Sequence, residues 1–171
     1  MIVLKTSREL KIMREAGKIA AIALKKAGAA VEPGVSTWEI DRVARRYIEG
    51  QGAIPTFLGY GGYPASACVS VNNVVIHGIP SKSHILREGD IVSIDVGATY
   101  EGFVGDNAFT FPCGKVSPEA QRLMDTTKES LFEGIHAAVA GARLGDIGSA
   151  VQRYAEARGY SVVRDYVGHG V

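Results

Sequence analysis

The stretch from Gly89 to Phe111 constrains the fold most, because its residues alternate as two β-strands joined by a tight turn would. The first arm places Ile91, Ser93 and Asp95 on one face and Val92, Ile94 and Val96 on the other. β-branched and aromatic residues fill both arms, and the turn near Tyr100-Glu101-Gly102 contains a glycine. The stretch therefore predicts an antiparallel hairpin.

Two aspartates, Asp95 and Asp106, lie on opposite arms of this hairpin. If Thr99 faces Gly102, the two aspartates fall directly opposite each other, with Cβ atoms roughly 4.5–5.5 Å apart. Two carboxylates so placed repel each other, so either one holds a proton or a cation lies between them. The alternative is that Asp106 is a turn residue and Asp95 faces water, and the residues alone leave both interpretations open.

Composition and charge limit the class of protein. The chain has 171 residues, 46% of them hydrophobic, which is enough for one globular domain. A net charge of +1 gives no electrostatic footprint for nucleic acid, and no apolar run suggests a membrane span. The two cysteines, Cys68 and Cys113, form no disulfide framework, which fits a cytoplasmic protein.

Capping patterns and apolar periodicity predict four helices and several short strands. The helices are expected from Thr6 to about Val31, from Ser36 to Gly50, from Ser117 to about Val139 and from Gly145 to about Arg158. Strands are expected at Ala67–Val71, at 74–76 and at Tyr160–Val163, in addition to the hairpin.

The segment from Pro55 to Pro64 is rich in glycine and aromatic residues and has no periodicity, which predicts a loop. Such a loop either packs on the core or forms the wall of an apolar pocket. His77 follows an apolar segment and precedes a glycine, so it could donate to or accept from a substrate, although a lone histidine is more often structural.

The helical segments also suggest an internal repeat at an offset of 107 residues. Residues 39–52 align with residues 146–159, and Gly34 aligns with Gly141. This predicts a single domain over 1–171, with a first repeat at about 7–112 and a partial second repeat at about 117–171. The strands of the second repeat would lie past residue 200, so an apolar sheet face and a sheet edge would be left uncovered.

Several motifs together resemble those of type I methionine aminopeptidase, from the first helix to the end of the chain. They are Gly59–Asn72, His77-Gly78-Ile79-Pro80, Asp95, Asp106 and Gly168-His169-Gly170. The resemblance implies an α+β pita-bread fold whose first half, two helices and an antiparallel sheet, is complete and whose second half is truncated. Asn73 departs from the family, in which an acidic residue is common at this position.

The resemblance also implies residue roles. Asp95 would chelate one metal ion, Asp106 would bridge two, and His169 would be a further ligand. His77 would contact the scissile peptide and stabilise the transition state. The slot for the methionine side chain would be lined by Phe57, Tyr60, Tyr63 and Cys68. The cofactors of the full enzyme would be two divalent ions of cobalt, manganese, iron, nickel or zinc.

The expected activity is metal-dependent removal of the N-terminal methionine from nascent proteins, with a small second residue preferred. The family completes its site with two glutamates downstream of the histidine ligand, one of them a general base. Residues 1–171 end two residues after His169, so this chain is expected to be inactive alone. The full enzyme is expected to be a monomer.

Two other functions stay open. The chain could be a non-catalytic fragment that associates with itself or with a complementary segment, or a proline-specific peptidase of the same fold.

Overall fold

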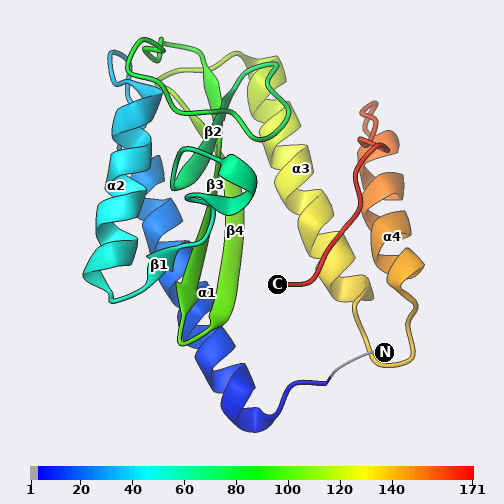
Figure 1. Ribbon diagram of the computed structural model, residues 1–171. Coiled ribbons are helices and arrows are strands. Elements are labelled where there is room, and N and C mark those ends of the chain that lie inside the picture. Colours follow the sequence, from blue (N-terminus) through cyan, green and yellow to red (C-terminus); the bar gives the residue numbers. More distant parts are fainter. Residues whose placement is uncertain (1–3) are drawn as a thin grey trace. The chain divides into compact units, whose positions relative to one another are not determined.

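The computed structural model describes residues 4–171, so the first three residues of the predicted domain lie outside the described residues (Figure 1). The chain divides into two compact units. The first holds the described residues up to Val116 together with Val171, and the second is Ser117–Gly170. Within residues 4–171, no helix combines the length and apolar character that crossing a membrane requires.

The first unit begins with two helices, α1 at Ser7–Gly28 and α2 at Thr37–Gly50. Each starts with the predicted capping box: the Glu9 N–H donates to Thr6 Oγ1 at 3.3 Å, and the Glu39 N–H donates to Ser36 Oγ at 3.3 Å. The predicted end of the first helix at Val31 is wrong. Beyond Gly28 the chain forms a tighter turn, in which Val31 donates to the Gly28 carbonyl at 3.1 Å.

Four antiparallel strands follow, and the third is central. The strands are β1 at Ile54–Pro55, β2 at Ala67–Val71, β3 at Ile91–Tyr100 and β4 at Phe103–Pro112. β1 and β2 both pair with β3, and β4 pairs with the other edge of β3. Helices α1 and α2 pack side by side against this sheet (Figure 1).

The core lies between the two helices and one face of the sheet. Its fully buried members from β3 are Val92, Ile94, Val96 and Ala98, and those from α2 are Ile40, Ala44 and Ile48. This is the apolar face that the alternation in the sequence predicts. The opposite face of β3 is therefore the one that bears Ser93 and Asp95.

The β3–β4 hairpin forms, but its predicted register is wrong. Tyr100 pairs with Phe103, so the two-residue turn is Glu101-Gly102, one residue later than expected. Glu101 and Gly102 have φ angles of 47° and 81°, the combination of a type I′ turn, and glycine readily takes the second position. The consequence is that Gly97, and not Asp95, lies opposite Asp106.

Helix α1 approaches β4 closely at Gly105. A side chain at Gly105 would run into the main chain of Ala16 and Gly17, so only glycine permits this approach. The Asn107 side-chain amide donates to the Gly17 carbonyl at 3.3 Å across the same contact. The helix and the strand therefore meet through their main chains at this level.

The second unit consists of two helices, α3 at Pro118–Ala137 and α4 at Leu144–Glu156. The Ser117 hydroxyl caps α3 by accepting the Ala120 N–H at 3.1 Å. Within this unit the two helices pack together, and the small residues Thr126, Ser130 and Gly134 of α3 are buried.

Two predicted strands are wrong, because neither 74–76 nor Tyr160–Val163 forms a strand. Val75 and Val163 are instead 63% and 58% exposed. A strand needs a partner for its backbone hydrogen bonds, and the described residues provide none at either place.

Candidate active site

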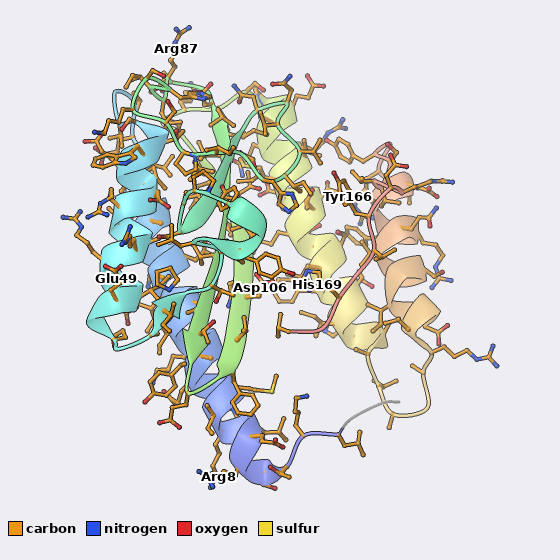
Figure 2. All side chains as sticks on the ribbon, in the orientation of Figure 1. Arg8, Glu49, Arg87, Asp106, Tyr166 and His169 are labelled. Carbon is orange, nitrogen blue, oxygen red and sulfur yellow. The ribbon has the colours of Figure 1, made fainter. Side chains whose placement is uncertain are left out.

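Asp95 and Asp106 lie on the face of the β3–β4 hairpin that is turned away from α1. Asp95 pairs with Ala108 and Asp106 pairs with Gly97, so the two aspartates are diagonal neighbours on one face. Such diagonal neighbours have Cα atoms about 7–8 Å apart, within joint reach of side chains. The predicted direct opposition of the two carboxylates is wrong, but their placement on one face is present. Figure 2 labels Asp106 beside β4.

The two carboxylates fit a divalent metal as oxygen donors, although they do not complete a site. Oδ1 of Asp95 is buried, and a buried carboxylate needs a compensating charge or hydrogen bonds. Within residues 4–171, no group of three or more His, Cys, Asp and Glu residues gathers to hold a metal ion. Asp95 and Asp106 can therefore be part of a ligand set, with further ligands needed.

Cys68 lies next to the aspartates, directly opposite Asp95 in the β2–β3 pairing. It is 5% exposed. Burial is the main cause that raises the pKa of its thiol, and the negative charges of Asp95 and Asp106 add to the effect. The thiol therefore stays protonated at neutral pH, which suits an apolar wall better than a thiolate ligand.

Phe57 lies over the same face of β3. A methyl group at Gly97 would lie 2.7 Å from Cε1 of Phe57 and 2.9 Å from Cβ of Thr56. Gly97 is two residues from Asp95 and faces Asp106, so the Phe57 ring borders the carboxylate pair. Tyr60 lies in a short 3-10 helix at Tyr60–Gly62 and is 81% exposed.

Tyr63 is half-buried, and its hydroxyl contacts two backbone carbonyls, those of Ala67 at 3.1 Å and Gly78 at 3.0 Å. Burial, followed by the neighbouring Cys68 thiol, raises the pKa of Tyr63 far above its usual value. The phenol therefore remains a hydrogen-bond donor throughout the physiological pH range.

The two histidines occupy different surroundings. His77 is exposed, in the segment between β2 and β3, and has a positive φ of 57°. His169 is also exposed and belongs to the second unit, where its Nδ1 lies 3.2 Å from the Gly170 carbonyl oxygen. Asp95 and Asp106 belong to the first unit, and the role of His169 as a metal ligand stays a prediction.

Three residues that sequence reasoning did not identify also shape this region: Asp41, Gly97 and Ser70. Asp41 of α2 is buried and accepts the N–H groups of Ser66 and Ala67 at 2.7 and 2.9 Å. A carboxylate within the apolar face of a helix is a detectable signal for such a role. Gly97 and Ser70 act through contacts with distant residues, which local sequence patterns do not reveal.

Comparison with known proteins identifies the family. The profile described as metallopeptidase family M24 matches residues 11–171. A methionine aminopeptidase from Clostridium acetobutylicum is 52% identical over all of this chain and 68% of its own length. Methionine aminopeptidase 1 of Bacillus subtilis is 50% identical, with the same coverage of both chains.

The fold agrees with this relationship. The crystal structure of methionine aminopeptidase from Rickettsia prowazekii superposes with a TM-score of 0.97 at 43% identity, over 100% of this chain and 68% of that one. The predicted α+β pita-bread fold is confirmed, because the four helices and the antiparallel sheet match this structure throughout. The chain therefore belongs to metallopeptidase family M24, with the methionine aminopeptidases, and is by family an enzyme.

Proposed function

We propose that Asp95 and Asp106 are metal ligands of a methionine aminopeptidase and that His169 is a further ligand. The observation that carries the proposal is the diagonal placement of the two carboxylates on one face of the hairpin. Family membership supports metal-dependent removal of methionine as the reaction. The ligand set does not select one metal among cobalt, manganese, iron, nickel and zinc.

When bound, divalent ions would supply Lewis-acid polarisation of the scissile carbonyl and lower the pKa of a nearby water. The residues of this chain have other tasks. Asp95 and Asp106 hold the ions, while His77 hydrogen-bonds to the scissile peptide and stabilises charge that develops in the transition state. Stabilising that charge lowers the barrier only if His77 is held in place before the reaction begins.

The methionine slot has an apolar and aromatic wall. Phe57 borders the carboxylates, and the neutral Cys68 thiol lies opposite Asp95. With Tyr60 and Tyr63, these side chains suit a flexible thioether, which makes favourable contacts with aromatic rings. The substrate is a new protein or peptide that begins with methionine and a small residue. Because new proteins are made in the cytoplasm, we expect the enzyme to act there.

Metal titration tests the ligand assignment. Calorimetric titration of residues 1–171 with Co²⁺ should show binding that Asp95→Asn or Asp106→Asn weakens by about tenfold or more, because each removes a charged oxygen ligand. Asp125→Asn is the matched control, since Asp125 is an exposed aspartate of α3 that contacts Gln121. Equal affinity for all four proteins would reject Asp95 and Asp106 as ligands.

A turnover assay tests the dependence on further residues. A polypeptide of residues 1–171 with added Co²⁺ or Mn²⁺ should release little or no methionine from a Met-Ala-Ser peptide, because it lacks the two glutamates that the resemblance implies. Rapid release would show that those glutamates are not needed. Cleavage of an Xaa-Pro peptide and not of Met-Ala-Ser would support the proline-specific alternative.

One observation favours a second candidate, a fragment that associates with itself or with a complementary segment. Helix α3 exposes Leu131, Phe132 and Ile135, each about half accessible to solvent. Apolar residues that gather on a surface commonly mark an interaction site. Size-exclusion chromatography should then give a dimer or larger species that Leu131→Glu converts to monomer, and a monomer at all concentrations would reject this candidate.

A further inference from the structure

His77 has a backbone conformation that other residues must hold. Its φ of 57° lies in the left-handed region, which residues with side chains rarely adopt, although histidine is among the more tolerant. A strained conformation persists only where the surrounding structure determines it. His77 is itself exposed, so its own packing does not supply that constraint.

The constraint comes from Gly78, which is bound to the edge of β2 that faces away from β3. The Val69 N–H donates to the Gly78 carbonyl at 2.9 Å, and the Gly78 N–H donates to Ser70 Oγ at 3.0 Å. A side chain at Gly78 would collide with the Val69 carbonyl and would lie 2.8 Å from Ser70 Cα. Residue 78 can therefore approach β2 this closely only as glycine.

Tyr63, in the loop that precedes β2, binds the carbonyl of the same residue, Gly78. Its hydroxyl lies 3.0 Å from the Gly78 carbonyl oxygen, which already accepts the Val69 N–H, and 3.1 Å from the Ala67 carbonyl oxygen. A single phenol proton is thus shared between the Ala67 carbonyl of β2 and the Gly78 carbonyl. Gly78 therefore makes three hydrogen bonds, with Val69, Ser70 and Tyr63, and none of them uses the His77 side chain.

These contacts lie one strand away from the carboxylates. Ser70 is two residues from Cys68, so both side chains project to the same face of the sheet. Cys68 faces Asp95, and Ser70 faces Ser93 in the same pairing. The peptide that follows His77 is therefore tied to β2, which pairs directly with the strand that carries Asp95.

We propose that Ser70, Gly78 and Tyr63 form a backbone clamp that positions His77 relative to Asp95. Ser70 and Tyr63 are positioning residues, because they act on His77 through Gly78: Ser70 accepts the N–H of the peptide that joins His77 to Gly78, and Tyr63 donates to the Gly78 carbonyl. The clamp lies entirely within the first unit. Its contribution to catalysis rests on the proposed function of His77. The two can be tested separately.

The first test compares Ser70→Ala with Ser93→Ala in the 171-residue chain. The two substitutions are matched, because each removes one hydroxyl from the same face and the same row of the sheet. Ser93 Oγ lies 2.8 Å from Thr110 Oγ1 of β4, whereas the Gly78 N–H donates to Ser70 Oγ. Ser70→Ala should accelerate amide hydrogen exchange at Gly78 about tenfold, the effect of one net hydrogen bond, and Ser93→Ala should not.

Equal exchange at Gly78 in the two variants would overturn the clamp. Tyr63→Phe provides a second variant, which removes the shared phenol proton and should accelerate exchange at Val69 and Gly78. Thermal unfolding of each variant shows whether faster exchange reflects loss of the whole fold. Faster exchange at every core amide of Ser70→Ala would also overturn the proposal, since the effect would then be general.

The second test measures position with Co²⁺, whose paramagnetism shifts nearby NMR resonances. Shifts of the Ile94 and Val96 amides, which flank Asp95, report that the metal is bound. In Ser70→Ala these shifts should persist, while the His77 ring resonance should lose most of its shift. Ser93→Ala should keep both.

An unchanged His77 shift in Ser70→Ala, with the metal bound, would overturn positioning. A wild-type chain whose Ile94 and Val96 resonances do not respond to Co²⁺ would instead reject the proposed metal site. The exchange comparison at Gly78 would then decide the clamp alone.

Discussion

The strongest single test of the first unit is the replacement of Asp41 by alanine. One oxygen of Asp41, Oδ1, accepts both the Ser66 N–H at 2.7 Å and the Ala67 N–H at 2.9 Å. Asp41 is 5% exposed, and Ser66 and Ala67 are fully buried, so water does not readily replace the lost acceptor. These two bonds fix the start of β2, directly before Cys68.

The magnitude follows from the two donors. Each buried N–H left without an acceptor costs about 1–3 kcal/mol, so Asp41→Ala should lower the free energy of unfolding by about 2–6 kcal/mol. Asp41→Asn should cost only about 1 kcal/mol, because an amide oxygen can stand in the place of Oδ1 and accept both bonds. The loss in Asp41→Ala is large against the roughly 5–15 kcal/mol of a typical domain.

The assay is urea unfolding followed by the fluorescence of Trp38, the single tryptophan, which lies on α2 and so reports on the first unit. Glu15→Ala is the control, because it removes an exposed carboxylate from α1. Two results would refute the reasoning. One is an Asp41→Ala variant as stable as Glu15→Ala, and the other is an Asp41→Asn variant as unstable as Asp41→Ala.

Two further predictions concern the site face. Gly97→Ala should displace the Phe57 ring and destabilise the chain by about 1–3 kcal/mol in urea unfolding, whereas Gly17→Ala, which meets no atom within 4 Å, should leave stability unchanged or raise it by up to about 1 kcal/mol; equal effects would contradict the packing. Because the pKa of Cys68 is raised in the folded chain, iodoacetamide should alkylate this thiol more slowly at pH 8 in the folded chain than in the urea-unfolded chain. The contribution of the neutral thiol to the free energy of unfolding should be present below about pH 8.5, the usual pKa of a cysteine, and should be lost as the pH rises above it. Alkylation at the same rate in the folded and unfolded chains, measured by mass spectrometry, would contradict the burial of Cys68.

The helix starts could be predicted because their signals are local. The capping pairs Thr6 and Glu9, and Ser36 and Glu39, lie three residues apart and form the expected hydrogen bonds. The end of α1 was harder, because alanine-rich sequence continues past Gly28 and the tighter final turn has no distinct residue pattern. Helix boundaries therefore follow from sequence best where a side chain binds the backbone nearby.

The hairpin shows why part of a wrong prediction survives. Moving the turn by one residue shifts the pairing by two, so every side chain keeps its face. Asp95 and Asp106 therefore remain on one surface although they are not opposite each other. An error of one residue in the pairing would have placed them on opposite surfaces.

The parts that sequence reasoning missed depend on distant partners. The apolar run at 74–76 has strand-like composition, but β3 already pairs with β1, β2 and β4. Ser70 gains its role from Gly78, and Gly97 gains its role from Phe57. No local pattern encodes such contacts, because they arise only after the sheet and the loop have come together.

The main-chain contact between α1 and β4 has a mechanical consequence for Asp106. Its two neighbours in the chain are both anchored to the helix, Gly105 by direct contact and Asn107 through its amide. The position of the Asp106 carboxylate, on the opposite face of β4, is thus fixed by the backbone of α1. The path of that backbone does not depend on which side chains α1 exposes to solvent. Substitutions of the exposed residues of α1 can therefore change solubility or charge without moving the Asp106 carboxylate within the sheet.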